Sequence, residues 1–537
     1  MQTAIPLGVK AFSRKIDDTL LCGLAMALWL LAFAWIRPLS DPDEGRYAVV
    51  ALDMLRTGNW VTPHLNGLPF FHKPPLYYWL AAAGYEWFGV HAWVARLPSM
   101  LGAWLASMSL LVVVRRYTNT STAIATVIIF LTMPFTYLAA QYANMDMLLA
   151  GCMCVCVTCA FIATIESERG KSWHAWITAA GVFAGLGFLA KGLIGLVLPG
   201  LVWCVWMLWE RRWKQLALLL YPPTWLAILA IAGPWAWFAQ KQHPQFFHYF
   251  FVTQHFQRYT ETGFNNPQPW WFYLAVITLA CLPWTLAGIY MLFRQWRARQ
   301  ELMPKSDSHP APTSLDRYML VWLLAVVAFF SIPSSKIVGY VLPALPPLAY
   351  LIGRIWQTTL GGDGSNVLRV RPKLSVTIGA AAVLCAVLAI GFGTKGVPQK
   401  ARWDCLAALP VQPDDRIMML GQLYYGVPFY MRTGQTPWVV DDWQAAKASK
   451  SDNWRKELLD AAEFSPNSAS HLLLEKQGAD HVLCTTKHRV WVVGELESAK
   501  QMTPSLSGTN PMLELGSRAV WLWTPHTACP APSPIVP

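Results

Sequence analysis

Long apolar runs alternate with short clusters of basic residues along this chain up to about residue 395. Runs of about 17–25 apolar residues have the length of a helix that crosses a bilayer. The pattern therefore predicts a polytopic α-helical membrane protein with about 11–13 spans. The clearest runs lie at about 19–36, 93–114, 121–140, 146–166, 174–190, 192–209, 215–236, 270–293, 318–332, 338–356 and 374–392.

Composition supports this class. Hydrophobic residues make up 55% of the chain and charged residues only 13%, whereas a soluble domain carries roughly twice that charged fraction. The net charge of +12 comes mainly from clusters between apolar runs, where Lys and Arg set topology, so we expect no nucleic-acid partner. The first apolar run has no small-residue cleavage pattern after it, and we expect no cleavable signal peptide.

The basic clusters also predict which loops face the cytoplasm. Three basic residues within the N-terminal segment place that segment inside. The run 76–90 is ambiguous because it is short and contains Glu86. If it crossed the membrane, Arg115 and Arg116 would lie outside, so we predict that it lies flat at the interface. Residues 37–92 then form a periplasmic loop with interfacial helices.

The pattern changes after about residue 395, where charged residues return and short alternating apolar runs appear. Such runs, separated by helical patterns, predict a small α/β domain over 395–537, following a transmembrane domain over 1–394. The span count places this domain in the periplasm. Because Cys405, Cys484 and Cys529 fall in it, one disulfide is possible there.

An acidic cluster follows the first apolar run. We predict that Asp41 caps the next helix and that Glu44 completes a capping box. This leaves Asp43 without a structural role, and Asp43 shares a helix face with Tyr47, four residues later. Because charge beside hydrocarbon is costly and tends to mark function, we interpret Asp43 as functional.

The predicted topology collects further charged and aromatic residues on the outer face. Snorkelling explains one lysine at a span end, but several such lysines beside two aspartates predict a pocket for an anionic substrate. Lys and Arg bind phosphate and stabilise it as a leaving group, and a carboxylate can orient an acceptor or take its proton. The outer-face set is Asp43, Arg46, Tyr47, His72, Lys73, Asp146, Lys191, Lys241, His255, Arg258, Lys336 and Tyr340.

Five short motifs follow one another along the chain. They are D-E-x-R-Y (Asp43–Tyr47), F-H-K-P-P-L-Y-Y-W (Phe71–Trp79), M-D-M-L (Met145–Leu148), A-K-G-x-x-G (Ala190–Gly195) and S-K-x-x-x-Y-V-L-P (Ser335–Pro343). In this order they resemble the bacterial GT-C membrane glycosyltransferases. The resemblance is to the aminoarabinose (lipid A) transferase branch, which is related to protein O-mannosyltransferases, and it covers about residues 19–356.

The resemblance implies a donor sugar on undecaprenyl phosphate and transfer at the periplasmic face of the bacterial inner membrane. The acceptor it implies is lipid A or lipopolysaccharide, and the sugar is a pentose or an amino sugar. With the charge pattern, the candidate catalytic residues are Asp43, Asp146 and Glu44. The candidate donor-phosphate residues are Lys73, Arg46, Tyr47, Lys191, Arg258, Lys336 and Tyr340.

Two positions depart from the branch, which usually carries an acidic residue where this chain has His72 and Gln254. Zinc held by His72 and His255 is a possible cofactor. Two other functions stay open: a protein O-mannosyltransferase-like enzyme and a transporter or flippase of lipid-linked sugars. Internal repeats, typical of many transporters, are not seen in the sequence, and the charges gather at one face.

Overall fold

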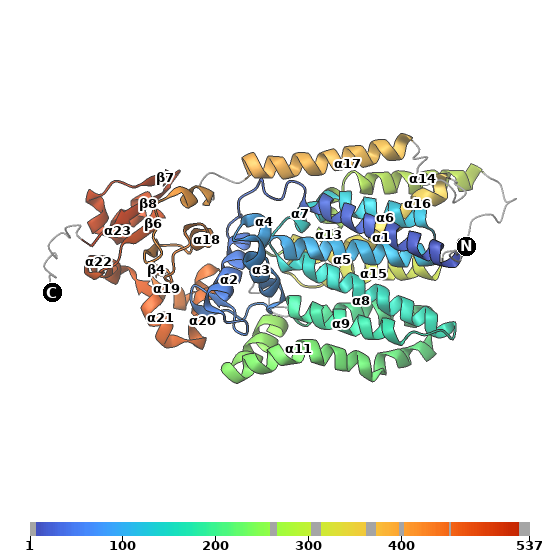
Figure 1. Ribbon diagram of the computed structural model, residues 1–537, viewed down its shortest axis with the longest axis horizontal. Helices are drawn as coiled ribbons and strands as arrows, with labels where there is room; N and C mark the ends of the chain where they lie inside the picture. Colours follow the sequence, from blue (N-terminus) through green and yellow to red (C-terminus); the bar gives the residue numbers. More distant parts are fainter. Residues whose placement is uncertain are drawn as a thin grey trace, which may run out of the picture. The chain divides into compact units, whose positions relative to one another are not determined.

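The computed structural model describes residues 7–257, 266–301, 313–360, 372–396, 402–449 and 453–525, and it divides into two units (Figure 1). The first unit contains a helix at each of the eleven predicted apolar runs. Unit 1 comprises Met1–Ile36, Arg96–Trp237 and Asn266–Gly391, and unit 2 comprises Arg37–Ala95, Phe238–Asn265 and Phe392–Pro537. One boundary between the units lies between Gly391 and Phe392, near the predicted division at about residue 394, and unit 2 also includes two earlier segments of the chain.

Most helices of unit 1 coincide with the apolar runs. They are α1 (Leu7–Leu31), α5 (Leu97–Tyr117), α6 (Thr120–Thr132), α7 (Pro134–Ala140), α8 (Met145–Glu168), α9 (His174–Lys191), α10 (Ile194–Trp209), η1 (Trp213–Leu220), α11 (Pro222–Gln242), α13 (Phe272–Ala280), α14 (Trp284–Glu301), α15 (Ser314–Ser331), η3 (Val338–Ala344), α16 (Leu345–Leu360) and α17 (Pro372–Gly391).

Six helical segments in the described residues are long and apolar enough to cross a membrane, and the number rises to eight if two bent pairs count as one span each. The pair α6–α7 bends by 66°. Met133 lies at this bend with an extended backbone (ψ 121°), directly before Pro134, because a residue that precedes proline is disfavoured in the helical region. The chain is therefore a polytopic helical membrane protein, as its hydropathy predicts.

Helix α8 is the most enclosed of these segments, with 94% of its apolar window buried. It packs along α5 and α9, which run beside it in Figure 1. A Cβ added at Gly151 of α8 would overlap the backbone of Gly102 in α5. Glycines here allow the two backbones to approach closely, as is common between membrane helices, and this packing holds the N-terminal turn of α8 in place.

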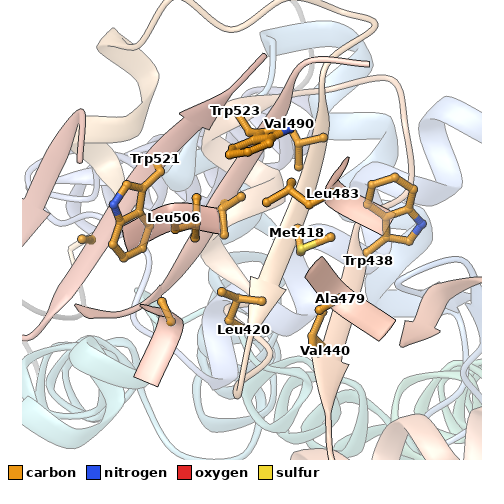
Figure 2. Packing of buried hydrophobic residues seen from close by; sticks show 13 residues of the cluster. Met418, Leu420, Trp438, Val440, Ala479, Leu483, Val490, Leu506, Trp521 and Trp523 are labelled. Carbon is orange, nitrogen blue, oxygen red and sulfur yellow. The ribbon is translucent and has the colours of Figure 1, made fainter. Parts of the chain in front are cut away.

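Unit 2 contains the predicted α/β region. Its six-stranded sheet has the order β5-β4-β3-β6-β8-β7. The first four strands are mutually parallel, and β8 pairs antiparallel with both of its neighbours, β6 and β7. Figure 2 shows its apolar core, whose members include Met418, Leu420, Val440, Trp521 and Trp523. The strands are β3 (Arg416–Leu420), β4 (Trp438–Asp441), β5 (Leu473–Glu475), β6 (Val490–Glu495), β7 (Leu513–Leu515) and β8 (Arg518–Trp523).

Helices and a short hairpin complete unit 2. Its N-terminal segment forms α2 (Asp43–Thr57), β1 (His64–Leu65), β2 (Leu68–Pro69), α3 (Leu76–Phe88) and α4 (Ala92–Ala95). Its later segments form η2 (His248–Gln257), η4 (Phe392–Gly396), η6 (Asp404–Ala408), α18 (Gly426–Met431), α19 (Trp443–Ala448), α20 (Trp454–Phe464), α21 (Pro466–Leu472), α22 (Lys476–Thr485), α23 (Leu496–Met502) and η7 (Pro504–Gly508).

The ambiguous run 76–90 forms α3, which has 13 residues. At 1.5 Å per residue it is about 20 Å long, shorter than the roughly 30 Å hydrocarbon core of a bilayer. It packs against α2 and α4 within unit 2. Its length agrees with a helix that does not span the membrane.

Candidate functional site

The candidate residues fall into two groups, one in each unit, and each group is described by itself. Unit 1 holds Asp146, Lys191, Lys336 and Tyr340, and unit 2 holds Asp43, Glu44, Arg46, Tyr47, His72 and Lys73. The backbone of His255 belongs to η2, and its side chain and the whole of Arg258 lie outside the described residues.

Asp146 and Lys191 lie together in unit 1. Asp146 stands in the first turn of α8, where its backbone N–H donates to Asn144 Oδ1 over 2.8 Å, and Lys191 is the last residue of α9. The Lys191 ammonium forms an ion pair with Asp146 Oδ1. It also lies 4.2 Å from the centre of the Tyr340 ring, within the range of a cation–π contact. Three residues singled out from separate motifs thus meet.

The backbone of η3 closes against this group. A Cβ added at Gly339 would overlap Asp146 Oδ2, so a larger residue there would displace the carboxylate. Lys336, just before η3, is 3% exposed and donates to the carbonyl oxygens of Gln268 (2.9 Å) and Pro333 (2.5 Å). Its ammonium is therefore held by its own loop and by the segment that precedes α13, and its predicted contact with a donor phosphate stays a prediction.

In unit 2 the first turns of α2 present an acidic group. Arg46 donates from Nη2 to Asp43 Oδ1 over 2.6 Å and from Nη1 to Glu457 Oε1 in α20. The Asp43 side chain is 45% exposed, whereas those of Arg46 and Glu457 are 15% and 13% exposed. Burial opposes the charge on Arg46, but its ion pair with Glu457 raises the pKa well above its ordinary value.

Aromatic rings cover the buried side of this group. The Tyr47 ring is 8% exposed and lies 6.0 Å and 6.3 Å from the rings of Tyr77 and Tyr78. The Arg46 guanidinium lies 5.4 Å from the centre of the Tyr47 ring and at the same distance from Tyr425. The charged N-terminal end of α2 thus packs against aromatic rings, and these contacts restrict the Arg46 side chain.

The segment before α3 contacts the same C-terminal helix. His72 Nε2 lies 3.8 Å from Asp460 Oδ2, and the Tyr249 hydroxyl donates to that carboxylate over 3.2 Å. The Phe70 ring stacks on His72 with centroids 4.6 Å apart. Lys73 follows, half-buried, directly before the two prolines that lead into α3.

These contacts bear on the zinc prediction. Among the described residues there is no group of three or more His, Cys, Asp or Glu side chains that could hold a metal ion. His72 and Asp460 supply two possible ligands, fewer than the three or four protein ligands of a zinc site. The described residues therefore do not fit a zinc ion, and zinc at His72 and His255 stays a prediction.

The predicted cap of α2 is wrong. The residue at the cap position is Pro42, and no side chain caps the helix. Asp41 Oδ2 instead accepts from Trp403 Nε1 (2.9 Å) and from the Gly426 backbone N–H (3.1 Å). These tertiary donors replace the helix N–H groups, and burial raises the Asp41 pKa to about 6 although both donors oppose that shift.

Glu44 does not form a capping box either. Its carboxylate is fully buried, pairs with Arg37 at 2.5 Å and accepts from the Ser40 backbone N–H at 3.0 Å. These contacts stabilise the turn that leads into α2. The predicted catalytic role of Glu44 stays a prediction.

Sequence reasoning missed Glu457 and Asp460. Both lie in a stretch that reads as an ordinary amphipathic helix of the C-terminal region, and their partners are far away in sequence. A signal was present in the spacing, because two acidic residues three apart share one helix face. The neighbouring sequence, however, does not identify Arg46 and His72 as their partners.

The family model described as dolichyl-phosphate-mannose-protein mannosyltransferase matches residues 72–238. A relative from Erwinia tasmaniensis named undecaprenyl phosphate-alpha-4-amino-4-deoxy-L-arabinose arabinosyl transferase is 31% identical over 69% of this chain and 65% of its own length. The enzyme of that name from Pseudomonas aeruginosa strain UCBPP-PA14 is 32% identical over 72% of this chain and 69% of its own.

The chain spans about two thirds of the length of these relatives. Among solved structures, ArnT from Cupriavidus metallidurans, crystallised with undecaprenyl phosphate, aligns with a TM-score of 0.76 at 24% identity, covering 95% of this chain and 99% of that one. The archaeal oligosaccharyltransferase AglB from Archaeoglobus fulgidus aligns with a TM-score of 0.51 at 14% identity, covering 92% and 71%. Both likenesses concern the fold.

Proposed function

This chain belongs to the undecaprenyl phosphate-aminoarabinose arabinosyl transferase family, and we propose that it is a glycosyltransferase that moves a pentose or amino sugar from undecaprenyl phosphate to lipid A. Its fold is of the GT-C type, as the sequence motifs predict. The observation that carries the proposal is the meeting of Asp146, Lys191 and Tyr340, three residues from separate motifs, in one group.

The proposed reaction is a displacement at the anomeric carbon of the donor sugar. The acceptor oxygen forms a bond to that carbon while the bond to the phosphate oxygen breaks, and undecaprenyl phosphate leaves with its electron pair. The role proposed for Lys73 is to stabilise the negative charge on the departing phosphate. Undecaprenyl phosphate is named for the crystallised ArnT, which supports it as the donor here.

The aspartates have different tasks according to the acceptor. A lipid A phosphate is already ionised at neutral pH, so Asp43 and Asp146 then position groups and no base is required. A hydroxyl acceptor has to lose its proton, and the half-exposed Asp43 carboxylate is the group that takes it.

We place the reaction at the periplasmic face of the inner membrane. Cys484 in unit 2 is disulfide-bonded, whereas Cys405 is a free thiol and Cys529 lies outside the described residues. Disulfides persist in oxidising compartments such as the bacterial periplasm. This supports a periplasmic location for unit 2 and for the acidic group that it carries.

One other function has a specific observation in its favour. The matched family model is named for protein mannosyltransferases, so the acceptor in the second candidate function is the hydroxyl of a secreted protein.

Mass spectrometry of lipid A from a deletion strain, complemented with the wild type or with Asp43→Asn, tests both functions. Loss of the sugar-modified lipid A in the deletion and the variant supports our proposal. Unchanged lipid A with loss of protein glycosylation supports the second function, and no change in either refutes both.

A further inference from the structure

One face of helix α20 contacts the acidic motif and the F-H-K-P-P motif of unit 2. Glu457, Asp460 and Phe464 are spaced three and four residues apart and so share that face. Glu457 pairs with Arg46 of α2, and Asp460 lies 3.8 Å from His72. The Phe464 ring lies 5.1 Å from that of Phe71.

The contact at Glu457 is a bridge of three charges. The two terminal nitrogens of Arg46 are divided between Glu457 and Asp43, so the guanidinium lies between two carboxylates. Glu457 is held from its other side, because the Tyr425 hydroxyl donates to its Oε2 over 2.8 Å. Asp43 is the exposed end of this bridge, and Glu457 is its buried end.

We propose that Glu457 is a positioning residue for the transfer reaction, which through Arg46 holds the Asp43 carboxylate in its working orientation. The inference rests on the proposed function of Asp43. An arginine side chain has considerable rotamer freedom, and the bridge with Glu457 removes that freedom before substrate binds. A reacting group keeps its productive geometry only when the residues that contact it are themselves held in one conformation.

This role differs from the donor-phosphate role predicted for Arg46. A guanidinium shared by two carboxylates has its charge balanced locally, so it orients an acidic group rather than attracting a phosphate. The two roles predict different kinetics. A phosphate ligand mainly sets the KM for the donor, whereas a positioning network mainly sets kcat.

The test uses Glu457→Gln, which keeps the shape of the side chain and removes its charge. Asp441→Asn is the matched control. The Asp441 side chain lies in β4, is 3% exposed and pairs at 2.5 Å with Arg455, which belongs to α20 as Glu457 does. The full-length variants are purified and assayed with undecaprenyl phosphate-linked 4-amino-4-deoxy-L-arabinose and lipid A, and their Tm is measured. We expect kcat of Glu457→Gln to fall about 10- to 100-fold, with an unchanged donor KM, and kcat of Asp441→Asn to stay at the wild-type level.

A second pair of variants keeps the inference testable if Glu457→Gln does not fold. Glu457→Asp retains the charge on a shorter side chain, and Tyr425→Phe keeps the ion pair while it frees Glu457 Oε2. Both are expected to retain the wild-type donor KM and to lose a smaller part of kcat. A wild-type kcat in all the folded variants, or a rise in donor KM alone, overturns the inference.

Failure of the inference is distinguishable from failure of the proposed function. If Asp43→Asn is inactive and Glu457→Gln has the wild-type kcat, Asp43 works without help from α20 and only the inference is wrong. If Asp43→Asn keeps wild-type turnover, the role proposed for Asp43 is wrong, and the positioning role of Glu457 is wrong with it.

Discussion

Asp146 and Lys191 form an ion pair between the first turn of α8 and the last residue of α9, and their side chains are only 9% and 10% exposed. Lys191→Gln leaves a buried carboxylate without its partner, which typically costs about 3–5 kcal/mol of stability. We expect the double variant Lys191→Gln/Asp146→Asn to regain much of that loss, because it removes the uncompensated charge.

Thermal unfolding of the purified single and double variants in detergent measures this coupling. Additive losses in the double variant would show that the two charges do not stabilise each other. All of these variants are expected to lose transfer activity, so stability and turnover have to be measured on the same samples.

Asp43 and Asp41 are expected to respond differently to the same change. Asp43→Asn removes the charge of the half-exposed carboxylate and should lower turnover about 10²–10⁴-fold if that carboxylate acts as a general base. Asp41→Asn should stay active, since its amide oxygen can accept from Trp403 and Gly426 as the carboxylate does. An inactive Asp41→Asn beside an active Asp43→Asn would make Asp41 the working carboxylate.

Lys73 is expected to act on the donor. Lys73→Ala should weaken use of the polyprenyl-phosphate sugar, because a cation next to the phosphate is lost. Lys214→Ala is the control, as Lys214 is exposed in η1 and belongs to a basic cluster that sets topology. Equal donor affinities for purified Lys73→Ala and wild type would remove Lys73 from the phosphate site.

Stability should depend on pH through Asp41. Burial raises its pKa from 3.8 to about 6, so the folded protein binds this proton more tightly than the unfolded chain does. The stabilisation is complete below about pH 4 and is lost as the pH rises through 6.

The Asp41→Asn variant does not lose stability in this way, because its amide does not ionise as the pH rises. At pH 7.5 its Tm should exceed that of the wild type, and the difference should shrink as the pH is lowered to about 4.5. Asp53, whose pKa burial also raises to about 6, remains in both proteins and cancels in the comparison. A Tm difference that does not change with pH would contradict a raised Asp41 pKa.

The topology predicts an outer C-terminal region. Alkaline phosphatase fused at about residue 400 should be active, because that enzyme needs an oxidising compartment to form its disulfides. A fusion at Lys214, in a basic loop expected to be cytoplasmic, should be inactive. The reverse result would mean that the run 76–90 crosses the membrane after all.

Much of the helical architecture follows from the sequence alone. Each of the eleven apolar runs contains a helix, because run length and composition are local properties that a membrane span has to satisfy by itself. The alternating runs after about residue 395 likewise predict the sheet in which β3 and β6 are the central strands. Asp146, Lys191 and Tyr340 were also singled out from their motifs as polar residues beside apolar runs, and the structure brings the three together.

The tertiary structure alone decided which side chains meet in unit 2. Arg46 and Glu457 are 411 residues apart, and Asp41 and Trp403 are 362 apart, so no local pattern pairs them. The capping rule failed at Asp41 for the same reason. Local helix N–H groups compete there with an indole and a backbone N–H that arrive from the C-terminal region, and a buried carboxylate takes the donors that the folded chain places around it.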